Sequence, residues 1–370
     1  MKGQIKAALI GAGMIANEGH IPAYRAASDD VALTAVCDTN AEAVANCARR
    51  HDIDHFYENA EEMLEKEKPD LVSVTTPNLT HASLTRLALE HGCNVLCEKP
   101  LALTYREARE LYDLAEKKGV RLVACQTQRF SPAFFAAREY IREGLLGTPY
   151  YGEINRVRRR GVPAWGHFLE KSYNGGGALA DIGVHMIDAQ LWLMGSPKVT
   201  ELTGFASRAI IDHETGIRYD LRESGSFAAK PGQTVRVDKN RCDVEEFASG
   251  MIRTETAGIN FKIAWAANMP NLTSLRILGD KLGLEVPDLK VYGTLGQDQT
   301  DMVPRLFPLG PYDNEPFSGH FYLIRNMADA MLGRGELLVR PEETLNTVAV
   351  IDLFYRSLEK GTTARMADIE

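Results

Sequence analysis

The segment ALIGAGMIA, residues 8–16, joins an apolar strand pattern to a helical pattern through two glycines. Gly11 lets the chain turn tightly after the strand, and Gly13 lets phosphate oxygens approach the backbone. The free N–H groups at the start of the next helix, where Met14 and Ile15 stand, then face a pyrophosphate. The spacing Gly-x-Gly-x-x-Ala is weak evidence by itself, because glycine-rich turns are common. It predicts a dinucleotide site only if a parallel sheet surrounds it.

The first third of the chain supplies that sheet, because short apolar runs alternate with segments of helical periodicity. The predicted strands cover residues 5–10, 33–37, 71–75, 94–97 and 121–126. Strict alternation implies parallel βαβ units with helices on both faces. The fold class is therefore α/β at the N-terminus, with a Rossmann doubly wound parallel sheet over residues 1–125.

The second predicted strand ends in AVCDTN, which places Asp38 where an acid binds the ribose 2′-hydroxyl of a dinucleotide. A carboxylate at this position repels a 2′-phosphate, and no arginine or lysine follows before Arg49. We therefore predict NAD as the cofactor in preference to NADP. The alternative interpretation makes Asp38 a turn residue ahead of the next helix.

After about residue 126 the pattern changes to that of an α+β domain, predicted over residues 126–370. A helix over 132–143 is followed by strands such as 151–160, and glycine-punctuated runs at 249–254 and 258–266 predict an antiparallel hairpin. The polar segment 220–240 is interpreted as an excursion from the sheet. The closing helices are predicted over 320–331 and 341–358.

Composition excludes several classes of partner. The formal net charge of −8 argues against a polyanion-binding surface, so no nucleic-acid partner is expected. The one basic cluster is local, and we interpret it as a strand with outward charges rather than as a substrate-facing group. It consists of Arg156, Arg158, Arg159 and Arg160.

The apolar runs and the cysteines bear on location. No run approaches the roughly twenty apolar residues of a membrane span, so no membrane partner is expected. The six cysteines form no CxxC pair and no zinc-type pattern, and most lie in apolar runs. Reduced, buried thiols in a cytoplasmic protein fit this usage best.

The run VLCEKPLAL ends the fifth predicted strand with Glu98, Lys99 and Pro100. Ligands of open α/β sheets bind beyond the carboxyl ends of the strands, so Lys99 is expected in the nicotinamide region. A cis bond before Pro100 would fix its direction. The structural alternative is a surface lysine that pairs with Glu98.

The run NGGGALADIGVHMID, residues 174–188, places Asp181, His185 and Asp188 on one face if it is helical. Three interpretations compete. In the first, Asp181 caps the helix and His185 is a core histidine whose hydrogen bonds are satisfied. In the second, the residues bind a metal, although the HExxH motif is absent. In the third, they act on a substrate hydroxyl beside a nicotinamide. Hydride removal from an alcohol requires a base, which a histidine or a lysine of lowered pKa can supply. The third interpretation therefore explains Lys99 and His185 together, and no metal site is predicted.

Four pieces in order now form a recognisable pattern: the glycine loop, TPNLTH at 76–81, EKP at 98–100 and GGGALADIGVHMID at 175–188. The chain resembles the glucose-fructose oxidoreductase, inositol dehydrogenase and rhizopine-catabolism (Gfo/Idh/MocA) family over nearly its whole length. The resemblance implies a Rossmann domain followed by a large, mostly antiparallel sheet, through which a homo-oligomer is expected to form. It implies hydride transfer between a carbohydrate substrate and NAD.

The resemblance also assigns roles to residues. Lys99, Asp181 and His185 match the catalytic set. The cofactor-binding set consists of Gly11, Gly13, Met14, Ile15, Asp38, Thr76, Pro77, Asn78, His81 and Glu98. Arg129 matches an arginine that reaches the substrate in some relatives. Thr127 departs from the asparagine that many relatives have at this position.

The run RRRGVPAWGHF resembles the branch that oxidises ring hydroxyls of pyranosides, including carbon 3 of glycosides. Trp165 and Phe168 are expected either to form an apolar wall against the sugar or to belong to the core. The prediction is an NAD-dependent dehydrogenase for a ring hydroxyl of a sugar, glycoside or inositol. The alternatives are a glycosidase that uses transient carbon-3 oxidation by bound NAD, and a non-catalytic NAD-binding regulator.

Overall fold

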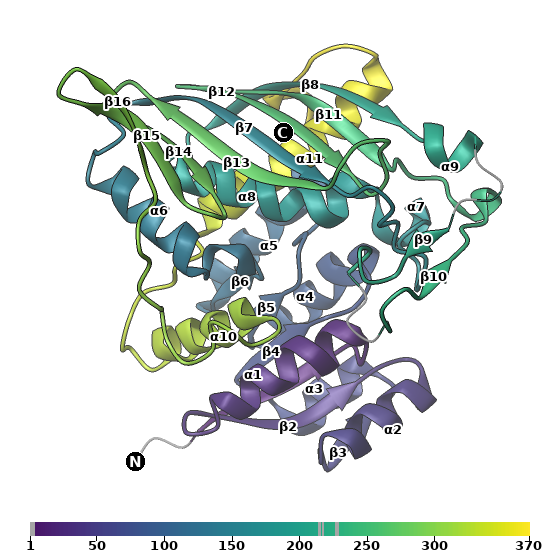
Figure 1. Ribbon diagram of the computed structural model, residues 1–370. Coiled ribbons are helices and arrows are strands. Elements are labelled where there is room, and N and C mark those ends of the chain that lie inside the picture. The colour runs from purple at the N-terminus through teal and green to yellow at the C-terminus, as the bar shows by residue number, and fades with distance from the viewer. Residues whose placement is uncertain (1–3, 214–215, 217, 226–228) are drawn as a thin grey trace. The chain divides into compact units, whose positions relative to one another are not determined.

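The computed structural model describes residues 4–213, 216, 218–225 and 229–370 (Figure 1). The chain forms two compact units. Unit 1 consists of Met1–Pro132 and Phe307–Leu345, and unit 2 of Ala133–Leu306 and Asn346–Glu370. The chain thus returns to unit 1 late in the sequence. The prediction of two contiguous domains, 1–125 and 126–370, did not include this return.

Unit 1 is built on a six-stranded sheet in the order β3-β2-β1-β4-β5-β6, with every neighbouring pair parallel. The strands are β1 (Ile5–Ile10), β2 (Val31–Cys37), β3 (His55–Tyr57), β4 (Leu71–Val74), β5 (Asn94–Cys97) and β6 (Leu122–Ala124). The predicted Rossmann sheet is confirmed. Sequence reasoning missed only β3, a short edge strand whose first two residues are exposed.

The helices of unit 1 follow the strands in turn. They are η1 (Ala16–His20), α1 (Ile21–Ala26), α2 (Ala41–Arg50), α3 (Ala60–Glu67), η2 (Asn78–Thr80), α4 (His81–Glu90), α5 (Tyr105–Lys118), η3 (Thr127–Arg129) and α10 (Ser318–Met331). Side chains of Asn40, Asn59 and Thr104 cap α2, α3 and α5 by accepting a backbone N–H of the first turn.

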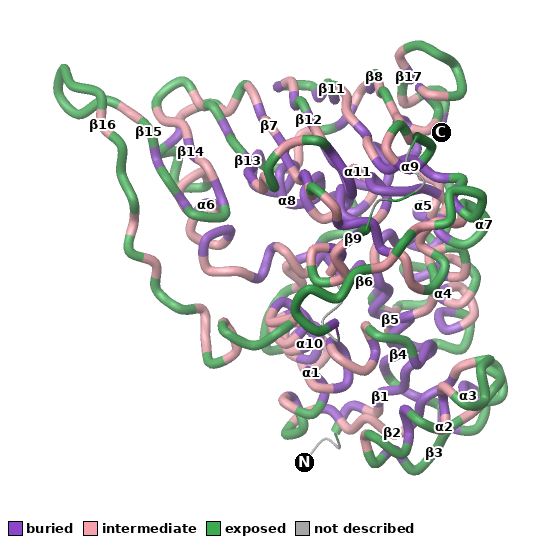
Figure 2. The backbone as a smooth tube through the Cα atoms, turned by 45° about the vertical axis from the view of Figure 1, so that its right-hand side comes forward, coloured by how far each residue is buried: buried purple, intermediate pink, exposed green. Residues whose placement is uncertain are grey.

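Helix α10 belongs to unit 1 because it completes the hydrophobic core. Leu323, Ile324 and Met327 of α10 are buried in the same cluster as Leu9 of β1 and Val36 of β2. The central strands β1, β4 and β5 are buried almost throughout, as Figure 2 shows. Strands buried on both faces read as continuous apolar runs, which is why their sequence pattern is so clear.

Unit 2 is built on a nine-stranded sheet in the order β16-β15-β14-β13-β7-β12-β11-β8-β17. Only β7 and β12 pair in parallel, so the predicted mostly antiparallel sheet is confirmed. The strands are β7 (Pro149–Val157), β8 (Val199–Ser207), β11 (Phe247–Thr254), β12 (Gly258–Ala264), β13 (Leu272–Gly279), β14 (Gly283–Val286), β15 (Lys290–Leu295), β16 (Asp298–Met302) and β17 (Ala364–Arg365).

Strands β9 (Tyr219–Asp220) and β10 (Thr234–Val235) form a separate two-stranded sheet. The segment 220–240 is therefore outside the large sheet, as predicted, although residues 226–228 lie outside the described part of the chain.

Helices cover one face of the large sheet (Figure 1). The helical elements of this part of the chain are α6 (Pro132–Arg142), α7 (Lys171–Asn174), η4 (Leu179–Gly183), α8 (Val184–Leu193), α9 (Ala209–His213), η5 (Lys239–Arg241), α11 (Pro341–Lys360) and η6 (Met366–Asp368). Glycines in the strands let the helices approach: a Cβ on Gly152 would lie 2.4 Å from Gln190 of α8, and one on Gly204 would lie 2.6 Å from Phe354 of α11.

No helix within the described ranges is long and apolar enough to cross a membrane. The six cysteines are free and buried, as the usage of cysteine predicted.

Candidate functional site

The glycine loop of unit 1 has the geometry that a dinucleotide requires. Gly11 adopts φ +109°, and a Cβ there would lie 2.7 Å from the backbone of Thr75, so only glycine fits. At Gly13 nothing lies within 4 Å of an added Cβ. This open space lies at the start of the helix that includes η1, where a pyrophosphate has to approach the backbone. The residues present therefore fit the cofactor that the sequence predicts.

Asp38, at the end of β2, holds the glycine loop by a hydrogen bond to its backbone. Its Oδ2 accepts a hydrogen bond from the Ala12 N–H (2.8 Å), and its Oδ1 accepts one from the Asn40 N–H (2.9 Å). The second bond is the turn contact of the alternative interpretation, and the first ties Asp38 to the glycine loop. Its contact with a ribose stays a prediction.

A surface hollow of about 410 Å³ opens beside this loop. An ion pair between Arg50 and Glu18 (2.9 Å) stands among its lining side chains. The lining residues are Ala12, Gly13, Met14, Asn17, Glu18, Ala43, Asn46, Cys47 and Arg50. A hollow beside the glycine loop suits the adenosine half of a dinucleotide.

His81 joins two segments of the predicted cofactor site. Its Nε2 lies 2.8 Å from the carbonyl oxygen of Thr76, and its Nδ1 lies 2.7 Å from that of Pro100. Burial lowers the pKa of His81, although both hydrogen bonds oppose the shift. The ring thus ties the segment after β4 to the segment after β5, and the Lys99–Pro100 bond is cis, as the sequence suggested.

Glu98 is the centre of a buried cluster that the sequence did not reveal. Its Oε1 lies 3.0 Å from Nε2 of His20 in η1 and 2.9 Å from Nε2 of His320 in α10. Nδ1 of His20 is in turn 3.1 Å from Oγ of Ser73, which bonds the hydroxyl of Tyr24. The cluster therefore connects the helix after the glycine loop, the end of β5 and the returning chain.

The charge of Glu98 is held by these contacts. Burial alone raises the pKa of its carboxyl, but the hydrogen bonds with His20 and His320 outweigh it and hold the pKa well below its usual range. Burial lowers the pKa of His20. The three ligand atoms lie within 4.8 Å of one another, as in metal sites, yet hydrogen bonds already account for their spacing.

The structure thus turns the carboxylate of Glu98 inward. Its Oε2 accepts the backbone N–H of Lys99 (3.2 Å), while the Lys99 side chain is half-buried. Sequence reasoning expected Glu98 at the cofactor, and that contact stays a prediction. The contacts of Glu98 show a structural role, which is to hold the backbone of Lys99.

Arg129, expected at the substrate, is fully buried in unit 1. Its Nη1 forms an ion pair with Glu343 and donates to the carbonyl oxygen of Leu338 (3.4 Å). These contacts fasten η3 to the returning segment. Glu343 was not predicted, because a first-turn glutamate on an exposed-looking helix gives no sequence signal of such a partner.

In unit 2 the triple glycine is explained by close packing. Gly175 adopts φ +72° and ends α7, a Cβ on Gly176 would lie 1.7 Å from the Tyr355 hydroxyl, and one on Gly177 would lie 2.0 Å from the carbonyl oxygen of Glu245. Gly176 and Gly177 therefore leave no room for a Cβ, while Gly175 adopts the left-handed conformation that favours glycine.

Glu245 anchors the helix that begins at this point. Its Oε2 accepts the Gly177 N–H (3.0 Å), and its Oε1 accepts both the Leu179 N–H (3.1 Å) and the Tyr355 hydroxyl (3.0 Å). Burial raises the pKa of Glu245, and these hydrogen bonds oppose the shift. A buried carboxylate at a helix start satisfies backbone N–H groups that have no partner within the helix.

Asp181 and His185 lie one turn apart on the anchored helix. Asp181 is in the π-helical element η4, His185 is the second residue of α8, and both side chains are half-buried. Trp265, which follows β12, donates its indole N–H to Oδ2 of Asp181 (2.9 Å). This orienting residue was missed, because it is distant in sequence and belongs to no motif. π-Helical turns occur often at functional sites.

Asp188 does not share the exposure of these two residues. It is buried, and its Oδ1 accepts a hydrogen bond from the Thr347 hydroxyl of α11 (3.2 Å). Asp188 is therefore a buried contact between α8 and α11, and it is not the third member of an accessible face as the sequence suggested.

The basic cluster on β7 also differs from its interpretation. Arg159 is exposed, but Arg156 and Arg158 are half-buried, and Asp181 lies close enough to raise the pKa of both. Burial has the larger, opposite effect on each. The outward-facing interpretation is therefore wrong for Arg156 and Arg158.

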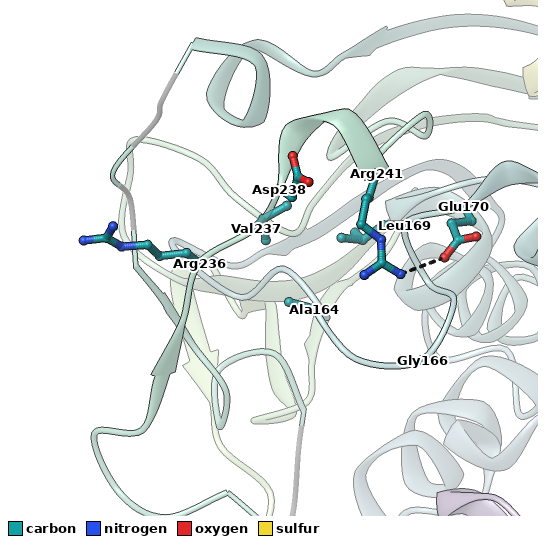
Figure 3. A pocket seen from close by; sticks show the side chains of 8 residues that line it. All are labelled: Ala164, Gly166, Leu169, Glu170, Arg236, Val237, Asp238 and Arg241. Atoms are coloured by element: carbon teal, nitrogen blue, oxygen red, sulfur yellow. Dashed lines mark ion pairs between the residues drawn. The ribbon is translucent and has the colours of Figure 1, made fainter.

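Trp165 and Phe168 pack against each other, with ring centroids 6.0 Å apart. Both are half-buried, and a role against the substrate stays a prediction. Their segment borders a pocket of about 160 Å³, shown in Figure 3, where Arg241 pairs with Glu170 (3.5 Å). The pocket is lined by Ala164, Gly166, Leu169, Glu170, Arg236, Val237, Asp238 and Arg241.

Known proteins resemble both units. A family model described as "Oxidoreductase family, NAD-binding Rossmann fold" matches residues 5–126, and one described as "GFO/IDH/MocA C-terminal domain" matches residues 134–285. The D-glucoside 3-dehydrogenase of Escherichia coli (strain K12) is 29% identical over 365 residues, which cover 98% of this chain and 97% of that protein.

Two further similarities concern one activity. Levoglucosan dehydrogenase of Pseudarthrobacter phenanthrenivorans is 30% identical over 43% of this chain and 42% of that protein. A solved structure, "Levoglucosan dehydrogenase, complex with NADH and levoglucosan", has a TM-score of 0.80 at 21% identity, covering 98% of this chain and 99% of that one. At this identity the structural likeness supports the fold alone.

The two loop glycines should respond differently to alanine. Gly11→Ala forces a clash with the backbone of Thr75 and should cost about 1–3 kcal/mol of stability. Gly13→Ala meets no neighbour, so the melting midpoint should hold, while the methyl group blocks approach of the pyrophosphate. Calorimetry and NADH fluorescence titration measure the two effects. An unchanged NADH affinity in Gly13→Ala would contradict the assigned geometry.

The buried charge of Glu98 predicts a pH dependence. Its lowered pKa means that its contribution to stability is complete above the unfolded value of about 4.5 and is lost as pH falls through the folded pKa. Glu98→Gln should therefore cost about 3 kcal/mol near pH 7, as for a broken buried pair. The difference in stability from the wild type should narrow as pH falls below about 4.5, measured by urea unfolding. The exposed Glu116→Gln is the control, and a pH-independent difference would refute the argument.

Proposed function

Because the chain belongs to the Gfo/Idh/MocA family of NAD-binding oxidoreductases, we propose that it dehydrogenates a ring hydroxyl of a pyranoside, at carbon 3 of a glycoside. That the chain is an NAD-dependent sugar oxidoreductase follows from its similarity to sugar dehydrogenases. The single observation that supports oxidation at carbon 3 of a glycoside is the similarity to a D-glucoside 3-dehydrogenase along 98% of the chain.

The proposed chemistry divides the work between the units. NAD, when bound at the glycine loop, accepts the hydride. In unit 1, Glu98 holds the backbone of Lys99, whose amine is proposed to take part in removing the hydroxyl proton. In unit 2, Asp181 is oriented by Trp265 and is proposed to accept a substrate hydroxyl, with His185 completing the proton route.

We also propose a homo-oligomer that forms through the helix-free face of the large sheet. Phe205 of β8 is 60% exposed and Met251 of β11 is 45% exposed, and both lie on the face opposite the buried Ala248 and Ile252. Apolar side chains on an open sheet face support association. The six buried thiols support a reducing compartment, and we propose the cytoplasm.

A substrate panel tests the proposed activity. Methyl glycosides, free sugars, anhydrosugars and inositols are each incubated with NAD, NADH absorbance is followed, and the oxidised carbon is identified by NMR. We expect NADH with a glycoside. Lys99→Ala should lower kcat by at least about 10²-fold, the size of a general-base effect, and leave NAD affinity intact. The exposed Lys117→Ala is the matched control.

Other results would contradict this proposal. NAD binding without NADH formation across the panel would favour a regulator. Glycoside cleavage without net NADH would favour a glycosidase that oxidises transiently. Normal turnover in Lys99→Ala would remove that residue from the chemistry.

The oligomer has its own test. Phe205→Glu places a charge on the helix-free face and should dissociate the assembly toward the 40.9 kDa monomer in light scattering. The control is Phe56→Glu on edge strand β3, where the phenyl group is 51% exposed but lies outside the proposed interface. A wild type that is monomeric at micromolar concentration, or an unaffected variant, would overturn this interface.

A further inference from the structure

The middle strand of the large sheet carries an arginine on its helix-covered face. Arg156 of β7 pairs with Ile263 of β12 and with Thr273 of β13, and laterally paired residues point to the same side of a sheet. A Cβ on Gly183 would lie 3.3 Å from Ile263, so this side faces η4. Arg156 therefore points toward the element that carries Asp181.

Along this face β7 changes from apolar to charged. Ile154, two residues earlier, is 1% exposed and belongs to the core, whereas Arg156 is half-buried. Burial, together with the like charge of Arg158, lowers the pKa of Arg156 to about 10, so the guanidinium remains charged near neutral pH. A charge placed in such surroundings needs hydrogen-bonding partners.

Arg156 uses few of its guanidinium N–H donors within the described part of the chain. Its Nη1 donates to the Thr273 hydroxyl (2.6 Å), which fixes its direction. Within the described residues no other side-chain hydrogen bond or ion pair of this guanidinium occurs. A guanidinium has five N–H donors, so several remain for a ligand.

Arg158 differs from Arg156 in this respect. Its Nη1 already donates to the carbonyl oxygens of Ser224 (2.9 Å) and Gly161 (3.3 Å). These bonds hold the loop after β7, so Arg158 has a structural function. Arg156 is the arginine of this pair whose donors stand available beside Asp181.

The charges around Arg156 nearly balance. Asp181 attracts both arginines, and Glu223 attracts Arg158 while its Oε1 accepts the backbone N–H groups of Arg159 and Arg160. These two cations and two carboxylates of unit 2 sum to zero charge, so this group of side chains offers an anionic ligand no excess positive charge. The arrangement offers one acceptor, Asp181, next to one donor, Arg156.

We propose that Arg156 is a further substrate-binding residue. Asp181 accepts a hydrogen bond from one hydroxyl of the sugar, and Arg156 donates a hydrogen bond to the oxygen of the neighbouring hydroxyl. The site then selects neutral pyranosides with a free vicinal diol over sugar acids and over deoxy sugars. This inference rests on the proposed function. A site built to bond a substrate hydroxyl discriminates against analogues that lack it, because its own polar group is left unpaired.

The test compares enzyme variants with substrate analogues. For wild type and Arg156→Met, kcat and KM are measured with methyl glucoside, its 2-deoxy and 4-deoxy analogues, and methyl glucuronide. Arg156→Met should lower kcat/KM for methyl glucoside by about 10–100-fold, as for a lost charge-assisted hydrogen bond, mainly through KM. For the analogue that lacks the bonded hydroxyl, the two enzymes should perform equally. Arg156→Lys should restore part of the loss.

Controls separate this inference from folding and from the proposed function. The exposed Arg159→Met should behave as wild type, and NADH affinity and melting midpoint show that Arg156→Met is folded. An unchanged kcat/KM in Arg156→Met, an equal loss on every analogue, or a wild-type preference for the glucuronide would overturn the inference. Wild-type enzyme that oxidises no sugar would instead overturn the proposed function.

Discussion

A buried carboxylate has to be hydrogen-bonded, and this constraint shapes both units of the chain. Glu98 in unit 1 is satisfied by His20, His320 and the backbone of Lys99, so the end of β5 cannot shift without leaving a charge unpaired. Glu245 in unit 2 is satisfied by two backbone N–H groups and the Tyr355 hydroxyl, so the start of the helix with Asp181 is equally fixed. Neither glutamate is placed where it could exchange its partners for water.

The fold of unit 1 could be predicted because its signals are local. Buried parallel strands read as continuous apolar runs, and the glycine loop needs a residue without a Cβ at Gly11, where an added Cβ would lie 2.7 Å from the Thr75 backbone. The loop motifs TPNLTH and EKP lie at the ends of β4 and β5 and are joined by His81. The strand β3 was not predicted, because three residues at an exposed edge show no hydrophobic periodicity.

Residues that act through long-range contacts could not be predicted. His320, Glu245 and Trp265 lie in ordinary apolar or acidic surroundings in the sequence, and only the fold brings them to Glu98, to the triple glycine and to Asp181. The outward-facing interpretation of the arginines failed for a related reason. Alternation along β7 separates Arg156 and Arg158 from Arg159, but it cannot say which side the helices cover. The return of α10 to unit 1 was missed because a helix pattern does not name the sheet against which it packs.

The two units use different physics for recognition, and this difference has a consequence for specificity. Around the glycine loop the proposed binding groups are backbone N–H donors and the space left by absent side chains, which a substitution can remove but can hardly redirect. In unit 2 the proposed binding groups are side chains: Arg156 is oriented by Thr273, and Asp181 by Trp265. Changing Arg156 or Thr273 alters the pattern of donors, while Glu245 continues to hold the helix start. With Arg156 as a substrate-binding residue, substrate choice is expected to vary on the face of β7 and β13 without disturbing the cofactor loop or the position of Asp181.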